Sequence, residues 1–127
     1  RKLTKADRYY LAWTDYQTHH GVEPTDQELS THLAAQGLWG RDHQPISPAN
    51  LRRHFLRWRI YNLWANRRAR TLTPSLTDIA AECARHGITA QYNKPITPNH
   101  ITHLTPDFER RWQTLNPRHA SEQGPSA

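Results

Sequence analysis

The stretch from position 24 to 54, PTDQELSTHLAAQGLWGRDHQPISPANLRRH, reveals how this chain is organised. Shifted by 50 positions it aligns without a gap to residues 74–104, PSLTDIAAECARHGITAQYNKPITPNHITHL. Six positions are identical, namely Pro24/Pro74, Ala34/Ala84, Gly37/Gly87, Pro45/Pro95, Ile46/Ile96 and Pro48/Pro98. The identities fall on turn and core residue types, which favours a duplicated unit over a coincidental match.

Each repeat contains the start and stop signals of two helices. A hydroxyl residue begins the first helix, an acid three positions later completes a capping box, and a glycine ends the helix. These residues are Thr25, Glu28 and Gly37 in one repeat and Ser75, Asp78 and Gly87 in the other. After a connector of about nine residues, a hydroxyl residue followed by proline begins a second, short helix. The pairs are Ser47-Pro48, opening a helix expected over residues 48–54, and Thr97-Pro98, opening one over residues 98–104.

Aromatic residues at helical spacing mark a longer helix before each repeat, over residues 5–20 and 57–70, and a shorter one over residues 106–115. In the second of these, Trp58, Tyr61 and Trp64 share one side of the helix. Such spacing is typical of a buried face, although stacked single-stranded bases are the alternative use of these rings.

The predicted fold class is therefore all-α. We expect two tandem helix-turn-helix-like units of about 50 residues that share a central helix, joined internally by long turns that could hold short extended segments. The first unit would span residues 1–56, the second residues 57–115, and residues 116–127 would form a flexible tail rich in Pro, Ser and Gly.

A capped helix, a glycine followed by an apolar residue, and a hydroxyl-capped short helix with Leu51 or Ile101 at its fourth position resemble the helix-turn-helix DNA-binding superfamily. The resemblance covers residues 25–54 and 75–104, and it implies that the short helices enter the major groove. The long connector departs from the usual tight turn, which leaves open which residues face DNA. The run His/Asn-Gln/Lys-Pro-Ile-Ser/Thr-Pro also resembles DNA-binding segments in proteins of actinobacterial conjugative plasmids.

Charge points to the same partner. The chain has 127 residues, a formal net charge of +6 and a sequence pI near 10.0. Residues 43–77 contain no acid but seven arginines, which are Arg52, Arg53, Arg57, Arg59, Arg67, Arg68 and Arg70. Such a block suits phosphate neutralisation, and a solvated basic helix face is the alternative.

The candidate DNA-contact residues follow from this assignment. Arg pairs with guanine and Asn with adenine, so the non-core positions of the short helices suit base reading. These positions are Ala49, Asn50, Arg52 and Arg53 in the first unit and Asn99, His100, Thr102 and His103 in the second. Candidates for phosphate or turn contacts are Arg41, His43, Gln44, Ser47, Arg57, Arg59, Arg67, Arg68, Arg70, Gln91, Tyr92, Asn93, Lys94 and Thr97. Trp39 is expected to pack between helices, with DNA contact as its alternative.

Other classes of function find little support. The nine histidines never occupy equivalent positions in both repeats, so we expect no metal or other cofactor. Cys83 stands at the position of Leu33 and is expected in the core. Scattered carboxylates and the lack of a glycine-rich phosphate loop argue against an enzyme.

The single cysteine fits a reducing, cytoplasmic location, and the short apolar runs predict no membrane span. The chain begins with Arg and lacks Met, so it could be a fragment of a longer protein. Duplex DNA is the expected partner, in repression, replication, partition or conjugation. The alternatives are a protein-interaction adaptor and non-specific or single-stranded nucleic-acid binding.

Overall fold

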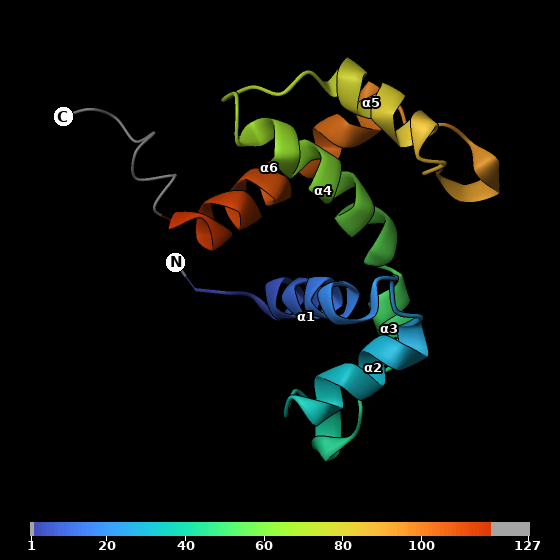
Figure 1. Cartoon of the computed structure of the whole chain (residues 1–127), viewed down its shortest axis with the longest axis vertical. Helices are drawn as coiled ribbons and strands as arrows, with labels where there is room; N and C mark the ends of the chain where they lie inside the picture. The colour runs from blue at the N-terminus through green and yellow to red at the C-terminus, as the bar shows by residue number, and fades with distance from the viewer. Residues whose placement is uncertain (1, 118–127) are drawn as a thin grey trace. The chain divides into compact units, whose positions relative to one another are not determined.

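The structure, a computed structural model, describes residues 2–117 and is all-α (Figure 1). Its elements are α1 (Lys5–His20), α2 (Asp26–Ala35), the one-turn segment η1 (Arg41–His43), α3 (Pro48–Arg52), α4 (Phe55–Arg68), α5 (Leu76–Arg85), η2 (Gln91–Asn93) and α6 (Pro98–Leu115). Within these residues no β-strand forms, and an isolated antiparallel bridge joins Thr89 to Pro95. Most of the predicted flexible tail, from residue 118, lies outside the described residues.

The chain divides into two compact units. The first unit is Lys2–Phe55, and the second begins at Leu56, one residue after α4 begins. The sequence places this boundary between residues 56 and 57.

The first unit is built from α1, α2 and α3. Thr4 forms a complete capping box with Asp7, and Thr25 forms one with Glu28. These side chains satisfy backbone N–H groups that have no partner within the helix, so they fix where α1 and α2 begin. Trp13, Leu29 and Leu51 are fully buried and bring one residue from each helix into the core. Along the connector, Ile46 is buried and its carbonyl oxygen accepts a hydrogen bond of 2.6 Å from the buried Ser30 hydroxyl. This bond fixes the chain just before α3 begins.

The second unit repeats the same helix pair with different side chains. Ile79, Cys83 and Ile101 are fully buried at the positions equivalent to Leu29, Leu33 and Leu51, as the repeat predicts. Tyr61 and Trp64 of α4 pack against Phe108 of α6, with ring centroids 5.4 and 5.7 Å apart. The aromatic residues of α4 and α6 are therefore core residues.

The helix after the second connector differs from the prediction. Two helices, over residues 98–104 and 106–115, were expected to meet at Pro106, but α6 is one continuous helix of 18 residues. Proline lacks the N–H that would bond the carbonyl oxygen of Thr102, four residues earlier. The Thr105 hydroxyl donates to that carbonyl oxygen at 2.8 Å, and so supplies the missing partner.

In the first unit the short helix is shorter than predicted, whereas in the second unit it is longer. Helix α3 ends at Arg52 rather than at His54, and α4 begins at Phe55 rather than at Arg57. Among the described residues the Ser47 side chain makes no capping bond, whereas the Thr97 hydroxyl accepts one from the His100 N–H at 3.1 Å. Proline at the first helical position remains the start signal that both helices share.

Candidate nucleic-acid interface

The starts of α3 and α6 have the same pattern of burial, with one buried residue among exposed neighbours. Leu51 and Ile101 are fully buried beneath them, as the sequence predicts. Their exposed neighbours on the outer side are Ala49, Asn50 and Arg52 in α3, Arg53 directly after it, and Asn99, Thr102 and His103 in α6. His100 of α6 is half-buried. The buried residue anchors the start of each helix, and the base-reading candidates other than His100 face solvent.

Arg52 forms an ion pair with Asp26, which the sequence did not predict. Its guanidinium Nη1 lies 2.7 Å from the Asp26 carboxylate, yet 67% of its side chain remains exposed. Asp26 is oriented in turn by the Gln27 backbone N–H, which donates to its other oxygen at 2.7 Å. The two residues are 26 positions apart, so only their placement in the folded unit could have shown the pair. Within the described residues Arg53 has no ion pair.

The arginines of the second unit fall into two groups. Arg57 and Arg70 are exposed and have no ion pair within residues 2–117. Arg67 is half-buried, bonds Glu82 through Nε at 2.5 Å and lies 3.6 Å from Asp78, which ties α4 to α5. Arg59 is also half-buried.

Arg68 is a buried structural residue. Only 4% of its side chain is exposed, and its Nε and Nη2 atoms donate to the two Glu109 oxygens at 2.8 and 3.0 Å. The guanidinium also lies 4.2 Å from the centroid of the Trp112 ring. Burial alone would raise the pKa of Glu109, but hydrogen bonds from Arg68 and Gln113 outweigh it and lower the pKa below its ordinary value. Arg68, predicted as a phosphate contact, is therefore not exposed enough to serve as one.

The connectors hold their polar residues on the surface. The residues predicted to make turn contacts, Arg41, His43, Gln44, Ser47, Gln91, Tyr92, Asn93, Lys94 and Thr97, are all exposed. The Trp39 ring stacks on His43 with centroids 4.7 Å apart and stays 40% exposed. Trp39 thus packs on the turn rather than deep between helices.

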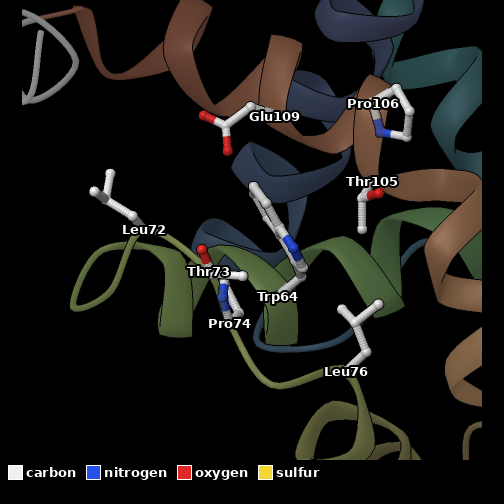
Figure 2. Close-up of a pocket in the computed structure, with 8 residues that line it drawn as sticks. All are labelled: Trp64, Leu72, Thr73, Pro74, Leu76, Thr105, Pro106 and Glu109. Carbon is white, nitrogen blue, oxygen red and sulfur yellow. The ribbon is translucent and has the colours of Figure 1, made fainter. Parts of the chain in front are cut away.

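A pocket of about 370 Å³ opens in the second unit (Figure 2). Trp64, Leu72 and Pro106 supply apolar walls, and Glu109 is its carboxylate. That carboxylate already accepts hydrogen bonds from Arg68 and Gln113. The lining therefore offers an apolar surface rather than a set of groups arranged for catalysis.

A polar cluster occupies the first unit between α1 and α2. The Tyr16 hydroxyl donates to Glu28 at 3.1 Å, and His32 lies 3.1 Å from the Asp15 carboxylate. The Glu28 carboxylate accepts hydrogen bonds from the Thr25 backbone N–H and from the Tyr16 hydroxyl, and these bonds, the first more than the second, lower its pKa. Glu28 therefore connects the N-terminus of α2 to α1.

In the part of the chain that the structure describes, no three His, Cys, Asp or Glu side chains come together in a way that could hold a metal ion. Over the same residues no helix is both long and apolar enough to cross a membrane. Comparisons with protein-family models, curated proteins and solved structures found no match.

Proposed function

We propose that this chain binds duplex DNA sequence-specifically through two tandem helix-turn-helix units, without catalysis. Its role would be that of a regulator or site-binding protein of a mobile element or plasmid, in repression, replication, partition or conjugation. The observation that carries the proposal is the outward side of α3 and of the residue that caps it, where Asn50, Arg52 and Arg53 are exposed around the buried Leu51. These side chains can form paired hydrogen bonds with base edges in the major groove.

The repeated packing supports a reading role for both units. Helices α2 and α3 bury Leu29, Leu33 and Leu51, and the equivalent residues of α5 and α6 are buried in the same way. A shared scaffold presents two different outer faces, with Arg52 replaced by Thr102 at the equivalent position. The two units would therefore read different bases, and we expect an asymmetric site or degenerate direct repeats.

Surface charge supports a polyanionic partner. Arg53, Arg57 and Arg70 are exposed cations with no ion pair among the described residues. Each phosphate neutralised adds about 0.9 to the slope of log affinity against log salt concentration. Contacts from these three residues alone would give a slope of about −3.

Single-stranded binding by the aromatic helix is less well supported. Its proposed stacking rings, Trp58, Tyr61 and Trp64, are only 1%, 2% and 2% exposed. Docking of a partner protein on these rings meets the same obstacle, because they already lie in the core. The exposed cations and the exposed residues at the starts of α3 and α6 favour duplex DNA over either alternative.

Binding to a random duplex, followed by selection of bound sequences from a duplex pool, tests the proposal. We expect salt-dependent binding of random duplex and enrichment of an asymmetric sequence. Arg53→Ala should weaken binding, whereas Arg8→Ala, which removes an equal charge from an exposed position of α1, should change it less. A lack of duplex binding at low salt would refute the proposal and favour a protein-interaction adaptor.

A further inference from the structure

The connectors of the two units adopt the same unusual turn. In the first, the Gly40 N–H donates to the Gln44 carbonyl oxygen at 2.7 Å, and in the second the Ala90 N–H donates to that of Lys94 at 2.8 Å. The two residues at each tip are left-handed, with φ of 55° and 58° at Asp42 and His43 and of 59° and 57° at Tyr92 and Asn93. Two consecutive left-handed residues are the geometry of a type I′ turn.

The tip residues differ in how well they suit this backbone. Asp, His and Asn enter the left-handed region more readily than other residues with side chains, whereas a bulky residue there is an outlier. Tyr92 is that outlier, with φ 59° and ψ 33°, and the equivalent residue Asp42 has nearly the same angles of 55° and 32°. Strained residues of this kind concentrate at functional sites.

The Tyr92 ring is also unusually exposed. It is 90% exposed, while Tyr10 and Tyr61 are 9% and 2% exposed. Aromatic rings bury large areas and are enriched at binding interfaces, so a ring held out on a turn is suited to a partner. Figure 1 shows this turn, in orange, projecting beyond the C-terminal end of α5.

The charge around the two tips also favours the second turn as a DNA contact. Residues 83–106 contain no acid, and Gln91, Asn93 and Lys94 beside Tyr92 are exposed donors. The first turn has the carboxylate of Asp42 where the second has the Tyr92 ring, and that charge would repel phosphates. The second turn therefore fits DNA better than the first.

We propose that Tyr92 is a DNA-contacting residue at the tip of the second turn. The two units would then contact DNA by different means, the first through Arg52 and Arg53 at the end of α3 and the second through this turn. The inference rests on the proposed duplex-DNA function and deepens it. Pro98 follows Tyr92 by six positions, a span of at most about 22 Å. A major groove about 12 Å wide that received the start of α6 would leave the turn within reach of the adjoining strand and groove. Tyr92 would contact the flank of the site.

Matched glycine substitutions at the two tips test this difference. Tyr92→Gly and Asp42→Gly act on nearly identical backbone angles, and glycine adopts them freely, so both variants should keep or raise the thermal midpoint. With duplex carrying the selected sequence, Tyr92→Gly should bind about fivefold more weakly, the effect expected when the burial of part of one aromatic ring against the DNA is lost. Asp42→Gly should bind as tightly as the wild type or tighter. Tyr92→Phe, which keeps the ring, should retain most of the affinity.

Hydroxyl-radical footprints give a second readout. The wild-type protection should extend beyond the base pairs read by α6, and it should shorten at that one end in Tyr92→Gly. Equal affinities and equal footprints for the two glycine variants would overturn the inference while leaving duplex binding intact. Failure of the wild-type chain to bind any duplex would instead overturn the proposed function, and the inference with it.

Discussion

Replacing Arg68 with alanine should destabilise the second unit rather than abolish a phosphate contact. Arg68→Ala removes the two hydrogen bonds to Glu109, at 2.8 and 3.0 Å, and the packing over Trp112 at 4.2 Å. Breaking a buried ion pair costs about 3–5 kcal/mol, but the Glu109 side chain is 34% exposed and can regain water. Because Glu109 is partly hydrated, we expect the free energy of unfolding to fall by about 2–3 kcal/mol. Loss of the contact with Trp112 would add to this value.

Urea and thermal unfolding, followed by circular dichroism and tryptophan fluorescence, measure this loss. In a unit of about 60 residues, 2–3 kcal/mol corresponds to a fall of more than about 10 °C in the midpoint. Arg53→Ala, which removes an exposed arginine, should change stability by less than about 0.5 kcal/mol while weakening DNA binding. A double-mutant cycle with Glu109→Ala should give a coupling energy above about 1 kcal/mol. A folded, fully stable Arg68→Ala protein with weakened DNA binding would refute the structural role.

Three further outcomes are expected. Asp26→Asn should tighten DNA binding severalfold, measured by fluorescence anisotropy, because it removes the negative charge 2.7 Å from the guanidinium of Arg52 and frees that guanidinium for bases. The pKa of Glu109 is lowered from 4.5 in the folded protein, so ionised Glu109 stabilises the fold fully above pH 4.5, and this stabilisation is lost as the pH falls through the folded pKa. The free energy of unfolding of Glu109→Gln should therefore depend less on pH between about pH 5 and 3 than that of the wild type. Thr105→Val should cost about 1 kcal/mol in urea unfolding, since it orphans the carbonyl oxygen that Pro106 cannot serve, and a simultaneous Pro106→Ala should restore the loss.

Local signals were enough to predict most helix starts. Thr25 and Glu28 form the predicted capping box because both partners lie within one turn of helix. The buried positions Leu51 and Ile101 also follow from spacing alone, since a four-residue offset from the cap selects the inner face. Not every local signal held, because the Ser75 side chain accepts from the Asp78 N–H without completing the predicted capping box, and Ser47 makes no capping bond among the described residues.

Predictions that needed distant partners were less complete. Helix α6 continues through Pro106 because the Thr105 hydroxyl bonds a carbonyl oxygen, and the sequence rule for proline does not foresee that bond. The arginine block looked uniform, but the fold buries Arg68 and leaves Arg53 exposed. The left-handed backbone at Asp42 and Tyr92 was not predicted, because neither residue is a glycine.

The duplication, the all-α class and the concentration of arginine in one stretch can all be read from the amino-acid order, because they depend on periodicity, capping and composition. Tertiary structure alone decided which charges are available to a partner. Arg52 and Asp26 meet across 26 positions, and Arg68 and Glu109 across 41. Such pairs form only when separate helices pack, because packing sets both the distance between the charges and their access to water.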